Sequence, residues 1–244
     1  DLIYIVRTIK NSIRQKLKKY KPETKEMPFH FRLLGKDRMA LFSFIHSLNT
    51  TFGISIFEPV AQALALSRFK KAEKQYPVGD QISENAQNEI QHIINDLSKG
   101  QTVDKKAEIE RIRKVADKGN MNGIKTVKAD LFLTDENDRI YLFDLKTAKP
   151  NVSNFKDFKR TLLEWVAIYL AKNPESNINS YIAIPYNPYH PKPYERWTMK
   201  GMIDLENELL VADEFWDFLG GEGAYQEVLD CFEIAGIELR SEID

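Results

Sequence analysis

Two aspartates and a lysine stand at spacings that could hold a divalent cation. Asp130 lies in the segment VKADLFLT, and Asp144 and Lys146 lie in the segment IYLFDLK. Both segments alternate apolar and polar residues with period two, which is typical of strands. Carboxylate oxygens bind hard cations such as Mg²⁺, and a neighbouring ammonium can orient a water or neutralise charge that develops on a phosphate. The pattern therefore predicts a metal site for phosphate chemistry.

The two segments predict an antiparallel hairpin. In the expected register Asp130 pairs with Asp144 and Thr134 pairs with Ile140, and residues 135–139 connect the strands. The apolar face is expected to consist of Val127, Ala129, Leu131 and Leu133 on the first strand and Tyr141, Phe143 and Leu145 on the second. The carboxylates then lie on the opposite face, where they would repel by roughly 4 kcal/mol without a cation. The alternative is a solvated sheet face that carries an ion pair.

The composition is that of a globular protein with balanced charge. Of 244 residues 43% are hydrophobic, and 35 basic and 36 acidic side chains give a formal charge of -1. This balance neither supports nor excludes a nucleic-acid partner. Cys231 is the single cysteine, so no disulfide framework is expected and a reducing compartment is favoured. We find no pattern of a membrane span or a signal peptide, and the first residue, Asp1, leaves room for an upstream start.

Residues 1–116 predict a mainly helical N-terminal part. Apolar stripes predict helices at 2–20, 36–48, from Ser55 or Glu58 to Lys74, 83–100 and 105–116. Residues 28–35 are expected to be irregular or a short strand, residues 49–53 to break the second helix, and residues 77–80 to form a turn. The basic face of the first helix fits either a phosphate-contacting arm or a solvated surface, and the solvated surface is the commoner case.

Glu58 has two interpretations that the sequence leaves open. A carboxylate in the first turn of a helix is stabilised by the helix dipole, with no further role. A carboxylate on an N-terminal helix can also reach the metal cluster and bind or orient a second cation.

Residues 117–203 are predicted to complete the catalytic sheet core. Ser153 or Asn154 can cap a helix that ends at Asn173-Pro174, and residues 180–184 read as a strand. This strand, helix and strand predict a right-handed parallel connection. Three basic residues near the start of that helix could hold DNA phosphates, although solvated helix charges are commoner: Lys156, Lys159 and Arg160.

The stretch from Pro185 to Trp197, PYNPYHPKPYERW, cannot form regular structure because it carries four prolines. A stiff loop with polar side chains suits the reading of base edges. The alternative is a solvent loop whose tyrosines pack on the core. The candidates for base contacts are Asn187, His190, Lys192 and Arg196.

Residues 204–244 predict a helical C-terminal part, with one apolar helix before Gly220 and a last helix over 224–235. This part is expected to be structural or to form a dimer contact. The whole chain is therefore predicted to be a single mixed α/β domain, with a central mixed sheet flanked by helices.

Asp130 followed by Asp144-x-Lys146 resembles the PD-(D/E)xK nuclease core, with Ala129 in place of the proline. Three longer stretches resemble type II restriction endonucleases, in particular the group that recognises GGNCC. They are HSLNTTFGISIFEPVA at 46–61, KADLFL with FDLKTAKPN, which ends at Asn151, and EFWDFLGGEGAY at 214–225.

This resemblance implies a restriction-endonuclease-like core and hydrolysis of double-stranded DNA by metal-activated water, leaving a 5'-phosphate. It implies that Mg²⁺ is bound by Asp130, Asp144, Glu58 and the backbone carbonyl of Leu145, and that Lys146 positions or activates the water. Lys149 and Asn151 join the expected DNA contacts. The resemblance further implies a homodimer that matches a two-fold symmetric target, no organic cofactor, no membrane, and the cytoplasm of a prokaryotic cell.

Two other classes stay open at this point. One is a nuclease of the same core that acts in repair or on branched or single-stranded DNA. The other is a DNA-binding module whose metal site is inactive. Digestion of a plasmid separates them, because a site-specific enzyme gives discrete bands, an unspecific nuclease gives a smear, and a binding module gives no cleavage.

Overall fold

The computed structural model describes residues 2–21, 27–146, 150 and 154–243. The chain forms two compact units, one of residues 1–63 and 226–244 and the other of residues 64–225. The organisation of the chain as a single domain stays a prediction.

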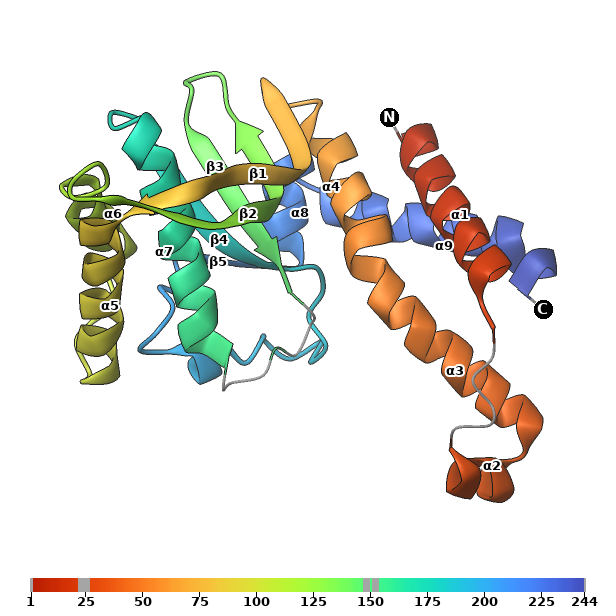
Figure 1. Cartoon of the computed structure of the whole chain (residues 1–244). Coiled ribbons are helices and arrows are strands. Elements are labelled where there is room, and N and C mark those ends of the chain that lie inside the picture. Colours follow the sequence, from red (N-terminus) through yellow and green to blue (C-terminus); the bar gives the residue numbers. More distant parts are fainter. Residues whose placement is uncertain (1, 22–26, 147–149, 151–153, 244) are drawn as a thin grey trace. The chain divides into compact units, whose positions relative to one another are not determined.

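The larger unit is built on a mixed sheet of five strands within the described residues (Figure 1). The strands are β1 (Lys71–Ser83), β2 (Met121–Thr134), β3 (Ile140–Leu145), β4 (Ile178–Ile184) and β5 (Leu209–Val211), and they lie side by side in this order. The pairs β1–β2 and β2–β3 are antiparallel, whereas the pairs β3–β4 and β4–β5 are parallel. The predicted mixed α/β class is confirmed.

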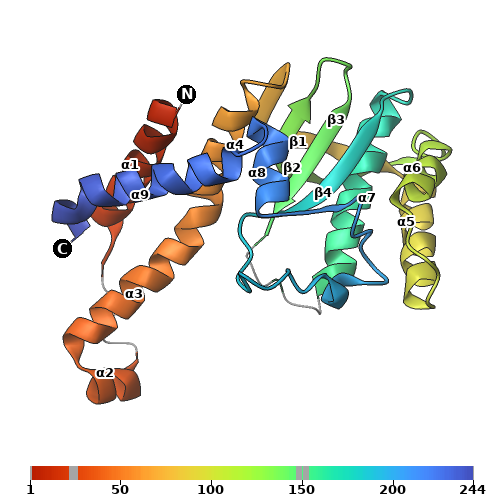
Figure 2. The ribbon, with the colours of Figure 1, turned by 180° about the vertical axis from the view of Figure 1, so that it is seen from behind.

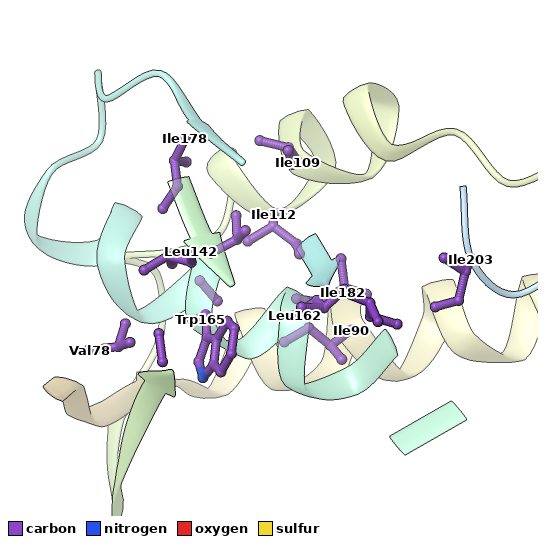
Figure 3. Packing of buried hydrophobic residues seen from close by; sticks show 14 of the residues in the cluster. Val78, Ile90, Ile109, Ile112, Leu142, Leu162, Trp165, Ile178, Ile182 and Ile203 are labelled. Carbon is purple, nitrogen blue, oxygen red and sulfur yellow. The ribbon is translucent and has the colours of Figure 1, made fainter. Parts of the chain in front are cut away.

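Helices cover both faces of this sheet. On one face lie α5 (Glu84–Ser98), α6 (Lys105–Arg113) and α7 (Phe155–Lys172), and on the other lies α8 (Asp213–Gly220) (Figures 1 and 2). The buried cluster on the α7 side includes Leu142, Leu162 and Trp165 (Figure 3). On the α8 side aromatic rings pack together, and the centre of the Phe143 ring lies 5.7 Å from that of the Phe215 ring.

The burial of both faces corrects one expectation. We expected Asp130 and Asp144 to lie opposite the core face, but Phe132 and Leu142 share their face and are themselves buried. The reason is the crossover helix α7, which covers this face, so that apolar residues are needed on both sides of β2 and β3. The predicted pair of carboxylates therefore lies at the border of a core.

The predicted crossover from β3 through α7 to β4 is confirmed, and so is the start of α5, where the Ser83 hydroxyl accepts a hydrogen bond from the Ala86 N–H at 3.1 Å. Asn154 occupies the N-cap position of α7 without a side-chain cap bond, and Ser153 lies outside the described residues.

Strand β1 contradicts the prediction of a helix to Lys74 and a turn at 77–80. The helix α4 (Glu58–Ala65) ends earlier, and the chain from Lys71 onward is a strand at the edge of the sheet. Its register against β2 shifts between Pro77 and Gly79 and again before Gln81. An edge strand tolerates proline and glycine at such irregularities, because ladder hydrogen bonds are interrupted there. The residues that looked like a turn therefore mark a bulge.

The C-terminal part of the larger unit differs from its prediction as well. Residues 209–211 form the short strand β5, where a helix was predicted, and α8 begins only at Asp213. The buried Leu209 and Val211 alternate along this strand, but three residues are too few for a readable pattern. The stretch from Pro185 to Glu195 has no helix or strand, as predicted. The prediction is wrong for Arg196 and Trp197, which begin the 3-10 helix η3 (Arg196–Met199) after the last proline of the stretch.

The smaller unit is helical. Its elements are α1 (Leu2–Lys19), α2 (Pro28–Leu34), α3 (Lys36–Thr51), the π-helix η1 (Phe52–Phe57), the start of α4, and most of α9 (Ala224–Ile243). Two expectations were wrong here. Residues 28–34 are helical, because a proline is well placed at a first helical position. Residues 49–53 continue α3 into η1 rather than break it. Among the residues that the structure describes, we find no helix with the length and hydropathy of a transmembrane span.

Candidate active site

The hairpin of β2 and β3 has the predicted register. Thr134 pairs with Ile140 and Leu131 pairs with Phe143, so the next positions in the same register are Asp130 and Asp144. The connection closes with a hydrogen bond from the Asp135 N–H to the Arg139 carbonyl at 3.1 Å. The register places both carboxylates at the same end of two adjacent strands.

Asp130, Asp144 and Lys146 form one cluster. The Lys146 ammonium lies 2.8 Å from Oδ2 of Asp144, and the two carboxyl groups are within hydrogen-bonding distance of each other. The backbone N–H of Leu145 donates to Oδ2 of Asp130 at 2.8 Å. The side chains that the sequence predicted to act together are thus brought together.

The electrostatics of this cluster follow from its burial. Asp144 is 7% exposed, and burial raises the pKa of its carboxyl to about 6, although the Lys146 ammonium lowers it and the Asp130 carboxylate raises it. Burial also raises the pKa of Asp130, against the hydrogen bond from Leu145, which lowers it. Two buried carboxyl groups in contact resist double ionisation. A divalent cation would relieve this repulsion.

Lys146 is held at the edge of the cluster. Its backbone N–H donates to the Ala183 carbonyl on β4 at 2.9 Å, and its ammonium lies 4.4 Å from the centre of the Phe158 ring on α7. A cation over an aromatic face is attracted by the ring, which favours a fixed orientation of the side chain. With 27% of its side chain exposed, the ammonium can meet a substrate from solvent.

The parallel pairing of β3 and β4 brings further segments to this edge. Leu145 pairs with Ala183, so both strands end at the same edge of the sheet. The loop that starts at Pro185 leaves β4 there, and α7 begins after β3 on the same side. Among the DNA-contact candidates of these segments, Lys156, His190 and Lys192 are exposed.

Two loop candidates have their polar groups engaged within the protein. The side-chain amide of Asn187 donates to the Lys192 carbonyl at 2.7 Å and accepts from the Tyr189 N–H at 2.9 Å. The Arg196 guanidinium donates to Glu214 at 2.6 Å. Both residues therefore shape the loop, and a base contact would have to compete with these bonds. Lys149 and Asn151 lie outside the described residues.

Two helix candidates separate clearly. Arg160 is partly exposed and donates to the Gln91 side chain at 2.6 Å. Lys159 is fully buried, and its ammonium lies 2.7 Å from Glu208 and 2.5 Å from Glu108. The expected phosphate contact of Lys159 is therefore wrong, because the side chain points into the core and its charge is neutralised there.

The buried carboxylates that hold Lys159 were not identified from the sequence. Glu208 also binds the ammonium of Lys105 at 2.6 Å, and that ammonium donates to the Ser180 hydroxyl at 2.9 Å. Burial by itself would raise the pKa of Glu208, but the ammonium groups of Lys105 and Lys159 outweigh it, so that the pKa of Glu208 is lowered. The pKa of Glu108 is raised, because burial outweighs the effect of Lys159 there. This network joins α6, α7 and the strand β4, and it is structural.

Glu58 is the first residue of α4 and is 2% exposed. It belongs to the smaller unit, whereas Asp130 and Asp144 belong to the larger one. Its role as a metal ligand stays a prediction. A favourable interaction with the helix dipole does not require the carboxylate to be buried. The burial of Glu58 is compatible both with a dipole interaction alone and with a role as a metal ligand.

The cluster fits a magnesium ion by the chemistry of its donors. No group of three or more His, Cys, Asp or Glu side chains that could hold a metal occurs within the residues the structure describes. Magnesium, however, is commonly held by one or two carboxylates together with substrate phosphates and water. Asp130 and Asp144, with the backbone carbonyl of Leu145 beside them, would supply such a partial set.

Comparison with known proteins identifies the family. The model of the type II restriction endonuclease HinfI family matches residues 3–236. The chain belongs to this family. The match spans nearly the whole chain and includes the hairpin with its acidic cluster.

Individual members are similar over most of the chain. The type II restriction enzyme MjaII from Methanocaldococcus jannaschii is 28% identical over 249 residues, which cover 90% of this chain and 65% of MjaII. HgiCII and HgiEI, both type II restriction enzymes from Herpetosiphon aurantiacus, are each 26% identical to this chain. Each match covers 88% of this chain, and the matches cover 80% of HgiCII and 79% of HgiEI. The chain therefore spans less than two thirds of the length of MjaII, the first of these relatives.

One residue at the site escaped the sequence analysis. Gln75 on β1 donates its side-chain amide to Oδ1 of Asp130 at 3.3 Å. The segment was predicted to end a helix and enter a turn, so nothing in its residue types placed it beside the hairpin. A period-two pattern over the whole of β1 would have been the signal, but the bulge interrupts it.

Proposed function

We propose that the chain is a type II site-specific deoxyribonuclease that hydrolyses phosphodiester bonds of double-stranded DNA with Mg²⁺. The products would carry 5'-phosphate and 3'-hydroxyl ends, and the target would be a short palindrome such as GGNCC in the DNA of a prokaryotic cytoplasm. The observation that carries the proposal is the contact among Asp130, Asp144 and Lys146 at one end of adjacent strands. Membership of the HinfI family supports it, and GGNCC rests on the sequence resemblance alone.

The residues of the cluster would have distinct roles. Asp130 and Asp144 would hold the cation, with the Leu145 carbonyl, and Glu58 is a further proposed ligand. Bound there, magnesium would polarise a phosphoryl oxygen and lower the pKa of a water. Lys146 would orient the attacking water and neutralise charge that develops on the phosphate, because its ammonium is partly exposed beside Asp144.

The DNA itself would be held by exposed cations around the same edge. Lys156 lies at the start of α7, and His190 and Lys192 lie on the loop after β4. Phosphate contacts of this kind position a duplex, whereas base contacts give specificity. Base contacts would come from the loop. For Asn187 and Arg196, hydrogen bonds to bases would have to replace the hydrogen bonds that these side chains make within the protein.

Plasmid digestion in MgCl₂, followed by sequencing of the fragment ends, tests the proposal directly. We expect discrete bands, one sequence at all ends, and no cleavage when EDTA replaces MgCl₂. A smear with unrelated ends would contradict site specificity. Retained binding of DNA with no cut under any divalent cation would contradict the enzymatic function.

We also propose that the active form is a homodimer, because one such site cuts one strand and a palindrome offers two equivalent strands. Apolar side chains on α2 and α3 support a second copy as the partner. The exposed ones are Phe29, Phe31, Leu33, Leu34, Leu41, Phe42 and Ile45. At roughly 100 Å² each they make a surface on the order of 700 Å², close to what one subunit contributes to a stable dimer.

Substitution of this surface should dissociate the dimer. In the double variant Phe29→Ser, Leu33→Ser, two side chains that are 85% and 81% exposed lose their apolar area, so we expect dimerisation at least about 100-fold weaker. Analytical ultracentrifugation measures it. Ile3→Ser is the control, since Ile3 is 79% exposed on α1. A dimer that survives the double variant and dissociates with Ile3→Ser would place the interface elsewhere.

A further inference from the structure

Gln75 has an unusual backbone for a strand residue. Its φ is 51°, in the left-handed region that residues other than glycine rarely adopt. The neighbouring pairs are regular, since Lys74 pairs with Leu131 and Tyr76 pairs with Ala129. Gln75 therefore lies opposite Asp130, and the strain is confined to this position. Strained residues of this kind persist where the surrounding structure fixes them, often at functional sites.

The side chain of Gln75 makes use of this backbone. Its amide donates to Oδ1 of Asp130 at 3.3 Å, while the Leu145 N–H donates to Oδ2 at 2.8 Å. Both oxygens of Asp130 are thus held, one from β1 and one from β3, the strands on either side of β2. A carboxylate held at both oxygens cannot rotate freely. Its remaining lone pairs keep a fixed direction.

We propose that Gln75 is a positioning residue for the metal site: it holds the Asp130 carboxylate in the orientation that binds magnesium. The inference rests on the proposed function, in which Asp130 is a metal ligand. Groups that hydrogen-bond to metal ligands fix the ligand's orientation, and their loss typically lowers metal affinity 10-fold to 100-fold. Gln75 acts through Asp130 and touches neither metal nor substrate.

The left-handed backbone separates this role from a merely structural one. Gln75→Gly removes the amide and also removes the strain, because glycine adopts positive φ without cost. If Gln75 positions Asp130, this variant is at least as stable as the wild type without metal and binds magnesium more weakly. If Gln75 only secures the edge strand, the variant unfolds at a lower temperature.

The experiment measures Tm of the full chain as a function of MgCl₂ concentration, since binding to the folded state raises Tm. We expect Gln75→Gly to need about 10-fold more Mg²⁺ than the wild type for the same rise in Tm, with an unchanged or higher Tm in EDTA. Gln75→Asn keeps an amide that is one carbon shorter and tolerates the backbone, so its Mg²⁺ requirement should rise too. Gln81→Gly, on the same strand and exposed, is the matched control. Its Mg²⁺ requirement should stay that of the wild type.

Asp130→Asn separates the proposed metal site from the proposed positioning role of Gln75. If this variant keeps the Mg²⁺-dependent rise in Tm, Asp130 is not a ligand and the proposed metal site fails. If Asp130→Asn abolishes the rise but the curves of Gln75→Gly and the wild type coincide, the positioning role alone is overturned. A Tm of Gln75→Gly in EDTA below that of the wild type would also overturn it.

Discussion

Asp144→Asn is expected to reduce DNA cleavage at least about a thousandfold and, at pH 8 without metal, to make the protein more stable. The loss of activity follows because the substitution removes a charged oxygen from the proposed magnesium site. The gain in stability follows because a buried carboxylate is replaced by a neutral amide of the same shape. Opposite changes in activity and stability are the signature of a residue kept for chemistry.

The pH dependence of this effect has a definite sign. The folded pKa of Asp144 is raised to about 6, whereas an aspartate in the unfolded chain titrates near about 4. Between these values the folded state binds the proton more tightly, so stability is lost as the pH rises from about 4 to about 6. The full cost above pH 6 is on the order of 2 to 3 kcal/mol. The advantage of Asp144→Asn should therefore be present at pH 8 and vanish at pH 4.

Urea unfolding of both proteins in EDTA at pH 4 and pH 8 measures this difference. Asp138→Asn is the matched control, because Asp138 is an exposed aspartate in the turn of the same hairpin. Its unfolding free energy should change by less than about 0.5 kcal/mol, and cleavage should persist. If Asp144→Asn cleaves DNA like the wild type, or is less stable at pH 8 than at pH 4 relative to the wild type, the account of this carboxylate is wrong.

The hairpin that carries Asp144 was predictable because its information is local. Period-two alternation fixed the faces of both strands, and the length of the connection fixed the register of Thr134 against Ile140. Three side chains that share a face at one end of such a hairpin must meet. The sequence did not show that α7 would bury this face, because coverage by a helix depends on tertiary packing.

Strand β1 could not be predicted from the sequence, because its own residues resemble those of a turn. Pro77 and Gly79 read as a turn, and an edge strand with shifts of register has no continuous alternation. The positive φ of Gln75 leaves no trace in residue type, since glutamine is not a residue that favours it. The contact between Gln75 and Asp130 could therefore be recognised only from the structure, in which β1 pairs with β2.

Lys159 illustrates a different limit. Lys159 lies four residues after Phe155 and three before Leu162, so its position is on the buried face of α7. A lysine is nevertheless exposed by default, and its residue type outweighed its position in the sequence-based prediction. Its partners Glu108 and Glu208 come from segments far away in the sequence. A charge compensated by distant groups can be recognised only once the fold brings those groups together.

Lys159→Met is expected to lower the free energy of unfolding by about 3 to 5 kcal/mol. The substitution removes one ammonium from a buried network and leaves the carboxylates of Glu108 and Glu208 with too little compensation. In the double variant Lys159→Met, Glu108→Leu the remaining pair of Lys105 and Glu208 at 2.6 Å is again neutral. Because buried ion pairs can be replaced by apolar residues at little cost, this variant should recover most of the lost stability.

Urea unfolding of the wild type, Lys159→Met and the double variant measures the stability effect, with Lys156→Met as the exposed control on the same helix. The same proteins decide which lysine contacts DNA. Lys156→Met should weaken DNA binding in the absence of divalent cation and reduce its salt dependence by about one phosphate contact. The double variant should bind DNA like the wild type, because Lys159 lies inside the core. Weak binding by a stable double variant would show that Lys159 reaches the DNA, and the buried network would then need a different explanation.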